Sequence, residues 1–266
     1  MPELPEVETI KNQLLKKIKG QTIIEVQVKD YQKNFQGNPQ HLQAKINGIW
    51  RRAKQLIFTL NNGYSFVIHL KMTGQLIYYT TLPSKIPPST HIIFTFSNHY
   101  YLFFNDWRKF GFLKIIKTTD LDKQFHHLGP EPLSLSFKEF RTILQKRPRS
   151  KIKPFLLDQQ IIVGLGNIYA QEACFKARIL PTRQISTLTD SELKRLHHAI
   201  QTILKAAIQH QGTSFDTSYR TPENKPGGYE PYIKVYHRKN CPNCSSKLKI
   251  LKQNGRSTYY CEHCQK

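Results

Sequence analysis

The sequence predicts an α+β protein in which a leading helix precedes a set of short strands, further helices follow, and a cysteine-rich hairpin ends the chain. Three observations predict this order. Segments with alternating apolar side chains recur between residues 22 and 117. Helical patterns with capping residues replace them from residue 136. Four of the five cysteines follow residue 240. The 266 residues are enough for two domains, each with its own core.

The N-terminal half combines one helix with strands. A helix is expected over residues 4–19, because Val7, Ile10, Leu14 and Ile18 recur at helical spacing and Gly20 suits the position after its end. Strands joined by Asn- and Gly-rich turns should then form a β-sandwich or barrel. They are expected at residues 22–29, 55–60, 64–70, 75–80, 91–96, 100–104 and 112–117.

The chain changes character after residue 118. Ser136–Glu139 and Thr189–Glu192 are capping boxes that should each open a helix. Residues 213–231 are rich in Gly, Pro, Ser and Thr, and we expect a mobile loop there. We therefore divide the chain into an N-terminal domain at residues 2–118, a linker at 119–132, a helical domain at 133–231 and a cysteine-rich module at 232–266.

The charge balance indicates a polyanionic partner. Lys and Arg exceed Asp and Glu by 40 − 18 = 22 in a chain that is 39% hydrophobic, a combination that does not favour disorder. Nucleic acid is the first candidate, and an anionic membrane surface is the second. No apolar run is long enough for a membrane span, and the N-terminus lacks a signal-peptide core. We therefore expect a cytoplasmic protein that is not membrane-bound.

The terminal cysteines predict a metal site. Two Cys-x2-Cys pairs are separated by sixteen residues, and Asn254-Gly255 between them is a hairpin signal. Two disulfides would be the alternative, but an intracellular compartment disfavours them. With four protein ligands, the ion would be one structural Zn²⁺. Its predicted ligands are Cys241, Cys244, Cys261 and Cys264.

The N-terminus has two possible roles on its own residues. If an aminopeptidase removes Met1, Pro2 carries a secondary amine with a pKa near ~8, so that a useful fraction is neutral and nucleophilic at pH 7. Glu3 is close enough to move protons. Alternatively, Pro2 and Pro5 simply open a helix whose first turn carries carboxylates. These residues alone support both interpretations equally.

Motifs along the whole chain resemble the formamidopyrimidine-DNA glycosylase family. Lys153–Gln159, Val163–Glu172 and Pro181 resemble its helix–two-turn–helix motif, which grips DNA phosphates. Leu4 favours this branch over the related endonuclease VIII branch. The other resembling segments are the N-terminal residues 1–9, the hairpin 51–54 with the family's catalytic lysine, the void-filling loops 69–74 and 106–111, and the zinc-finger strand 256–261.

The resemblance implies a fold and a reaction. The fold would be an N-terminal β-sandwich, a helix–two-turn–helix domain and a zinc-finger hairpin. The protein would act as a monomer on damaged double-stranded DNA in base excision repair. It would remove oxidised purines such as 8-oxoguanine and formamidopyrimidines as a bifunctional glycosylase and lyase, through a Pro2 Schiff base and β,δ-elimination. Glu3 and Lys54 would assist catalysis, and Glu6 would anchor the N-terminal helix or a water.

The resemblance also implies the DNA contacts. A glycosylase must evict the target nucleotide and stabilise the gap that is left. Met72 and Phe110 would fill that gap, and Arg108 would pair with the orphaned cytosine. On their own, without the flanking motif, Met72 and Phe110 would rather be ordinary core residues. Phosphate contacts are expected from Lys54, His69, Lys153, Asn167, Tyr169 and Arg256.

Some positions depart from the family pattern. Lys71 and His237 each replace a common glycine, and Trp107 replaces a common proline. Residues 216–229 lack the family's usual sequence for the loop over the everted base. These changes leave the preferred lesion open, and oxidised pyrimidines are an alternative. A non-catalytic binder of damaged DNA and a zinc-ribbon protein of RNA are alternatives from other classes.

Overall fold

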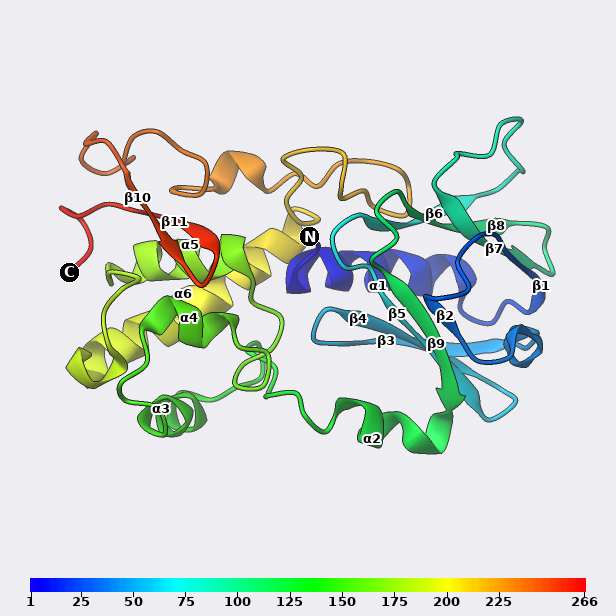
Figure 1. Cartoon of the computed structure of the whole chain (residues 1–266), viewed down its shortest axis with the longest axis horizontal. Coiled ribbons are helices and arrows are strands. Elements are labelled where there is room, and N and C mark those ends of the chain that lie inside the picture. The colour runs from blue at the N-terminus through cyan, green and yellow to red at the C-terminus, as the bar shows by residue number, and fades with distance from the viewer. The chain divides into compact units, whose positions relative to one another are not determined.

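The computed structural model describes all 266 residues and divides into two compact units. The first unit consists of Met1–His126 and His210–Glu230, and the second of His127–Gln209 and Pro231–Lys266. The elements of both are labelled in Figure 1. This division differs from the expected domains, because residues 210–230 group with the N-terminal half and the cysteine-rich module groups with the helices.

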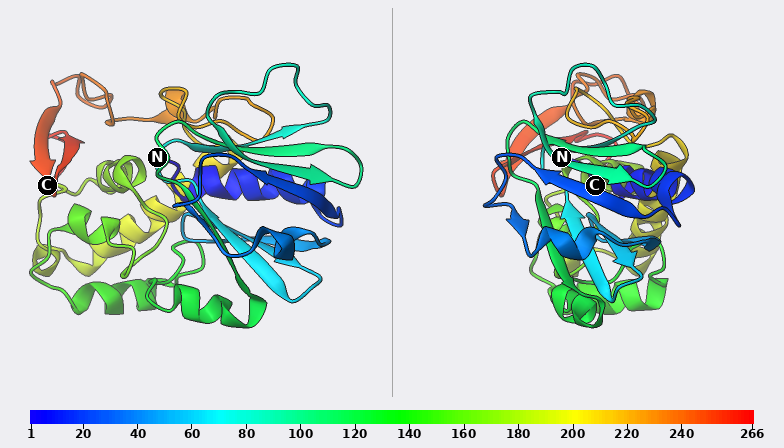
Figure 2. Two further views of the ribbon diagram at one scale, coloured as in Figure 1. Left: turned by 45° about the vertical axis from the view of Figure 1, so that its right-hand side comes forward. Right: turned by 90° about the vertical axis from the view of Figure 1, so that its right-hand side faces the viewer.

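The first unit is a β-sandwich with one long helix, α1 (Leu4–Ile18). One sheet has the strand order β1-β7-β8-β6, and the other has the order β2-β9-β5-β4-β3. Neighbouring strands are antiparallel except β2 and β9. The two sheets and α1 are seen from two further sides in Figure 2. The strands are β1 (Ile23–Val28), β2 (Phe35–Gln36), β3 (Ile46–Arg52), β4 (Gln55–Leu60), β5 (Tyr64–His69), β6 (Gly74–Tyr79), β7 (Thr90–Phe96), β8 (Tyr101–Asp106) and β9 (Phe112–Lys117).

The core of the first unit joins the two sheets and the helix. Phe58 and Phe66 stack with ring centroids 4.4 Å apart, and Phe66 is 5.6 Å from Phe94 of the opposite sheet. The expected apolar stripe of α1 is buried in the same core. Gly20 has a φ of 83°, the left-handed value expected just after a helix end.

All seven expected strands are present, with small shifts at their ends, and two strands were not expected. The alternation of β3 is broken by Gly48, and its pairing with β4 shifts register between Ile46 and Gly48. β2 has only two residues. The expected linker contains a further short helix, α2 (Leu121–Phe125).

The second unit consists of helices and one hairpin. Ser136 and Glu139 form the expected capping box, and Thr189 exchanges hydrogen bonds with Glu192 in the same way. Asn254 and Gly255 both have positive φ, as a type I′ hairpin turn requires. No helix of the structure is long and apolar enough to cross a membrane. The elements are α3 (Phe137–Gln145), α4 (Ile152–Leu157), α5 (Asn167–Ala177), α6 (Asp190–Gln209), β10 (Lys249–Gln253) and β11 (Arg256–Tyr260).

The segment of residues 210–230, called the 210–230 segment below, packs against the sandwich. Tyr78 N–H donates to the Pro222 carbonyl at 2.9 Å. Tyr219 is 3% exposed, and its hydroxyl donates to the Gln211 carbonyl at 2.9 Å. The expectation of a loop at residues 213–231 did not include these contacts, and the one with Tyr78 depends on a partner far away in the sequence.

A buried carboxylate ties the segment before the zinc-finger hairpin to α5. Glu172 is 4% exposed and accepts backbone N–H groups from Lys234, Val235 and Tyr236 at 2.8 to 2.9 Å. Burial raises the pKa of this carboxyl, although the three hydrogen bonds oppose the shift.

We predict that Glu172→Gln lowers the free energy of unfolding by about 2 kcal/mol, because the amide leaves buried N–H groups poorly matched. Urea denaturation would measure the loss. Glu139→Gln, on the exposed capping box of α3, is the control and should cost less than about 1 kcal/mol. Equal losses in the two variants would contradict the stabilising role of the buried Glu172 carboxylate.

Candidate functional site

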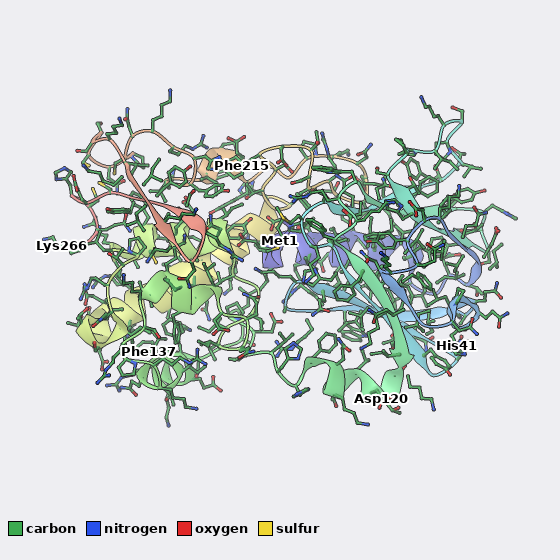
Figure 3. All side chains as sticks on the ribbon, in the orientation of Figure 1. Met1, His41, Asp120, Phe137, Phe215 and Lys266 are labelled. Atoms are coloured by element: carbon green, nitrogen blue, oxygen red, sulfur yellow. The ribbon has the colours of Figure 1, made fainter.

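The chain terminus is fixed by the Glu6 carboxylate. Pro2 is buried, and Glu3 and Glu6 are each 2% exposed. Glu6 Oε2 accepts the Glu3 N–H at 2.8 Å, and Oε1 accepts the Thr213 N–H at 2.8 Å. Met1, labelled in Figure 3, is 41% exposed. One carboxylate therefore holds both the start of α1 and the 210–230 segment.

The surroundings of Glu6 leave it little freedom to move. Gly212 has a φ of 81°, and a Cβ there would lie 2.8 Å from Glu6 Cγ and Oε1. Burial raises the pKa of Tyr219 well above its usual value, and the Glu6 charge adds to the shift. Tyr219 therefore stays protonated and keeps donating its hydrogen bond.

The hairpin that carries Lys54 is attached to α1. Arg51 Nε donates to Glu8 Oε2 at 2.7 Å, and its Nη1 donates to the Ala53 carbonyl at 2.8 Å. Burial raises the pKa of Glu8, but hydrogen bonds from Lys11 and Arg51 outweigh this and hold the pKa below its usual range. Lys54 is only 6% exposed, which is rare for lysine. Its amine therefore lies inside the fold rather than on a solvated face.

His69 is a neutral imidazole. Burial, followed by the charges of Lys71 and Lys54, lowers its pKa to about 3. Its Nδ1 accepts the Lys71 N–H at 3.0 Å, which assigns the ring proton to Nε2. His69 can thus donate a hydrogen bond to a phosphate without carrying charge. Lys71, where the family has glycine, has a φ of 51°.

Met72, Arg108 and Phe110 form an exposed cluster, here called the wedge. Met72 is 42% exposed and Phe110 is 50% exposed, so neither is a core residue. Arg108 Nη1 lies 3.5 Å from Met72 Sδ, and its guanidinium lies 4.6 Å from the Phe110 ring centroid. The two loops therefore present one arginine between two apolar side chains, as expected.

The expected phosphate contacts of the second unit fall into two groups. Arg256 is exposed and Asn167 is partly exposed; Asn167 Nδ2 donates to the Ser257 carbonyl at 3.1 Å. By contrast, Lys153 and Tyr169 are fully buried. Lys153 Nζ donates to Thr258 Oγ1 at 2.6 Å, so its amine is bonded to the hairpin, and its phosphate contact stays a prediction. No nearby residue in the sequence indicates this partner, which lies 105 residues away.

Gln159 braces the turn before α5, a role that we did not assign from the sequence. Its Oε1 accepts the Gly164 N–H at 2.8 Å, and its Nε2 donates to the Leu165 carbonyl at 2.9 Å. Gly164 has a φ of 85°. The sequence feature that could have indicated this role is an amide side chain five residues before a Gly-x-Gly turn.

The four terminal cysteines form one cluster with the geometry of a zinc site. Their Sγ atoms lie within 4.8 Å of one another, with Cys241 and Cys264 at 3.7 Å and Cys244 and Cys261 at 3.5 Å. Tetrahedral Zn–S bonds of about 2.3 Å place sulfurs about 3.8 Å apart. None of the cysteines forms a disulfide. The donor set therefore fits one structural zinc and leaves no open position for catalysis.

His237, the other position where the family has glycine, also has a left-handed backbone, with a φ of 56°. Its ring stacks on Tyr236 with centroids 4.2 Å apart. Lys71 and His237 therefore both stand at positions where a positive φ favours glycine.

Three family models match successive parts of the chain. They are the formamidopyrimidine-DNA glycosylase N-terminal domain at residues 1–113, the H2TH domain of the same family at 128–218, and the zinc finger found in FPG and IleRS at 239–266.

Full-length relatives carry the same name. Formamidopyrimidine-DNA glycosylase of Pelotomaculum thermopropionicum is 39% identical over 284 aligned residues, covering 100% of this chain and 99% of the relative. That of Rickettsia felis is 40% identical, covering 100% and 98%. Among solved structures, a Lactococcus lactis FPG mutant with Fapy-dG-containing DNA has a TM-score of 0.91 at 34% identity, covering 99% of each chain. The same organism's Fpg with abasic-site DNA has a TM-score of 0.90 at 33% identity and the same coverage.

The buried neutral His69 predicts acid sensitivity. Its folded-state pKa of about 3 lies below the unfolded value, so the unfolded chain binds more protons as pH falls from 6.5 toward 3, and stability falls with it. Between pH 6.5 and 4.5 the wild type should lose about 2 kcal/mol more than His69→Gln. Urea denaturation at each pH measures this, with the exposed His198→Gln as control. A His69→Gln protein with the wild-type pH slope would contradict it.

We predict that Cys261→Ser removes the metal and disrupts the β10–β11 hairpin, because structural zinc contributes on the order of 10 kcal/mol to small folded modules. Elemental analysis should find about one zinc per wild-type chain. Cys174→Ala is the matched control, since Cys174 is buried in α5, away from the cluster, and should keep the zinc. Retention of a full equivalent of zinc by Cys261→Ser would refute the site.

Proposed function

Since the chain belongs to the formamidopyrimidine-DNA glycosylase family, we propose that it is a bifunctional DNA glycosylase and lyase of bacterial base excision repair. It removes oxidised purines from duplex DNA and cuts the strand at the resulting site. The observation that carries this proposal is the buried, doubly held N-terminus, with Pro2 and Glu3 fixed by Glu6. A chain end that served only to open a helix would not need this second tie to a distant segment.

The proposed reaction begins when an aminopeptidase removes the exposed Met1. The Pro2 nitrogen then attacks C1′ of the damaged nucleotide, and the glycosidic bond breaks with its electron pair leaving on the base. The proton that the amine loses balances the one that the departing base takes up. Glu3 donates a proton to the ring oxygen as the sugar opens. Pro2 and C1′ are then joined as an iminium ion, which a secondary amine must form with a permanent positive charge.

The iminium then serves as an electron sink for strand cleavage. It acidifies the C2′ proton, whose loss expels the 3′ phosphate by β-elimination, and a second elimination expels the 5′ phosphate. Lys54 is the catalytic lysine of this proposal, and its 6% exposure shields its charge from water. Glu6 holds the helix that carries Pro2 and is not consumed.

DNA recognition uses both units of the chain. The wedge of Met72, Arg108 and Phe110 fills the gap left by the evicted nucleotide, with Arg108 pairing the orphaned base. His69, Asn167 and Arg256 donate to phosphates, while the buried Lys153 and Tyr169 support these contacts from inside. Solved relatives with Fapy-dG and carbocyclic 8-oxo-G DNA support a purine lesion as the substrate.

We predict that Pro2→Gly lowers borohydride trapping and strand cleavage by at least about 100-fold, because the primary amine forms a less electrophilic, uncharged imine. The assay uses an 8-oxoguanine duplex and the mature protein. Pro5→Ala is the matched control, because Pro5 lies three residues further on, in the first turn of α1, and carries no free amine.

Each outcome of this assay has a definite meaning. Trapping by Pro5→Ala together with its loss in Pro2→Gly supports the proposal. Full lyase activity in Pro2→Gly refutes the nucleophile. Tight binding of lesion DNA by the wild type without any cleavage would instead identify a non-catalytic damage binder.

A further inference from the structure

The loops that carry the wedge meet at a buried aspartate that the proposed mechanism does not use. We propose that Asp106 is a positioning residue that joins the loop of Met72 to the loop of Arg108 and Phe110, with Tyr31 and Asn34 completing the scaffold. The wedge is thereby formed before DNA arrives. This inference rests on the proposed function, because it concerns how the base is evicted.

Asp106 binds both loops through its two carboxylate oxygens. Its side chain is fully buried. Oδ1 accepts the hydroxyl of Thr73, which directly follows Met72 in the chain. Oδ2 accepts the Gly111 N–H at 2.7 Å, directly after Phe110. Each wedge loop is therefore held next to its apolar side chain.

Thr73 extends the link to the arginine. Its Oγ1 also accepts the Arg108 N–H at 3.3 Å. Thr73 is 3% exposed, so water does not compete for these bonds. Met72 is thus adjacent to Thr73, Arg108 is hydrogen-bonded to Thr73, and Phe110 is next to Gly111, which is hydrogen-bonded to Asp106.

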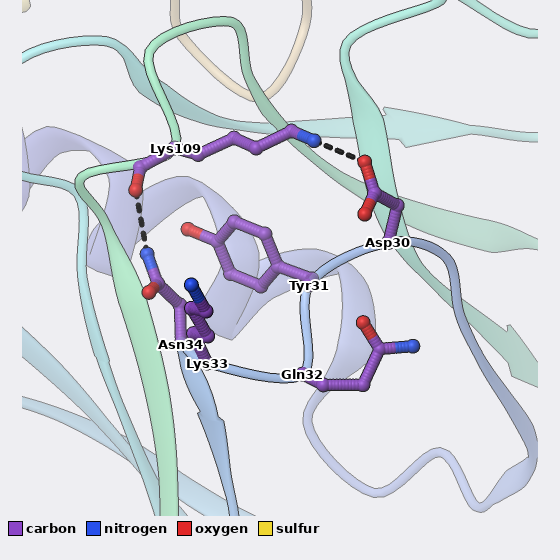
Figure 4. A pocket seen from close by; sticks show the side chains of 6 residues that line it. All are labelled: Asp30, Tyr31, Gln32, Lys33, Asn34 and Lys109. Atoms are coloured by element: carbon purple, nitrogen blue, oxygen red, sulfur yellow. Dashed lines mark hydrogen bonds and ion pairs between the residues drawn. The ribbon is translucent and has the colours of Figure 1, made fainter.

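Tyr31 and Asn34 hold the turn of Phe110 from the other side. Asn34 Nδ2 donates to the carbonyls of Lys109 at 2.6 Å and Gly111 at 2.7 Å. Tyr31 donates to the Gly111 carbonyl at 2.7 Å and lies 3.2 Å from Asp106 Oδ2. Figure 4 shows the Asn34 amide beneath the Lys109 carbonyl. The backbone on both sides of Phe110 is therefore bonded to side chains of another loop.

The geometry of the turn requires such support. Lys109 has a φ of 53°, a left-handed conformation that is costly for residues other than glycine. A Cβ on Gly111 would lie 2.8 Å from Phe104 Cζ and 3.1 Å from Asp106 Oδ2. A turn held this closely loses little freedom when Phe110 enters the duplex, so less binding energy is spent on ordering it.

The same turn offers a matched control on its exposed side. Asp30 pairs with Lys109 across a cavity of about 410 Å³ that Tyr31 and Asn34 also line (Figure 4). The Asp30 side chain is 82% exposed, and exposed ion pairs contribute little to stability. Asp30→Asn and Asp106→Asn both replace a carboxylate by an amide. The Asp30 side chain is exposed to water, whereas the Asp106 side chain is buried in the scaffold.

The test compares two substrates that differ only in whether a base must be evicted. Single-turnover excision is measured on a duplex with 8-oxoguanine opposite cytosine, and elimination on the same duplex with a preformed abasic site. We expect Asp106→Asn to slow excision by at least about tenfold, because a wedge displaced by a fraction of an ångström evicts the base poorly. Elimination and borohydride trapping at the abasic site should stay within about threefold of wild type.

Two further measurements keep the proposal testable if Asp106→Asn folds poorly. Tyr31→Phe removes a single hydroxyl and should give a smaller excision defect of the same kind. The fluorescence of 2-aminopurine beside the lesion reports unstacking directly, and its rise should be slowed in both scaffold variants but not in Asp30→Asn.

The outcomes separate this inference from the proposed function. Equal losses on both substrates, or no loss on either, would overturn the positioning role of Asp106. So would an Asp30→Asn protein as defective as Asp106→Asn. If the wild type itself fails to excise the lesion or to be trapped, the proposed function fails instead.

Discussion

The structure depends on holding a chain terminus still. Termini normally fray, yet an N-terminal nucleophile must stay within bonding distance of its target atom. The Glu6 carboxylate meets this constraint by accepting one N–H from Glu3 and one from Thr213, both at 2.8 Å. Because Thr213 lies on the 210–230 segment, the same carboxylate that holds the start of the chain also holds that segment against α1. The proposed nucleophile and the 210–230 segment therefore share one anchor.

Buried carboxylates recur as joints in this basic chain. Glu6 holds the terminus, Asp106 holds the wedge loops, and Glu172 holds the segment before the zinc finger, each by accepting backbone N–H groups. Such bonds fix main-chain positions more firmly than surface ion pairs do. The excess of positive charge is then available to contact DNA phosphates. Two basic residues are exceptions, because His69 is neutral and Lys153 is buried. The zinc cluster performs the same fixing task where the hairpin is too small for a core.

Local signals predicted most of the fold. Capping boxes placed α3 and α6, Asn254-Gly255 placed the last hairpin, and cysteine spacing identified all four metal ligands. The strand β3 was missed because Gly48 and its shifted register hide the alternation. The burial of Lys153 was not predicted, because nothing nearby in the sequence indicates Thr258 as its partner. Asp106 went unnoticed for the same reason: its importance comes from three loops that meet only in space.

The central claim is that the Pro2 nitrogen forms the covalent bond to DNA. Mass spectrometry of the borohydride-trapped complex, after digestion of protein and DNA, tests it most directly. We expect a sugar remnant on the N-terminal peptide, on Pro2 of a chain that has lost Met1. A remnant on Lys54 or another lysine, or a trapped chain that still carries Met1, would contradict it.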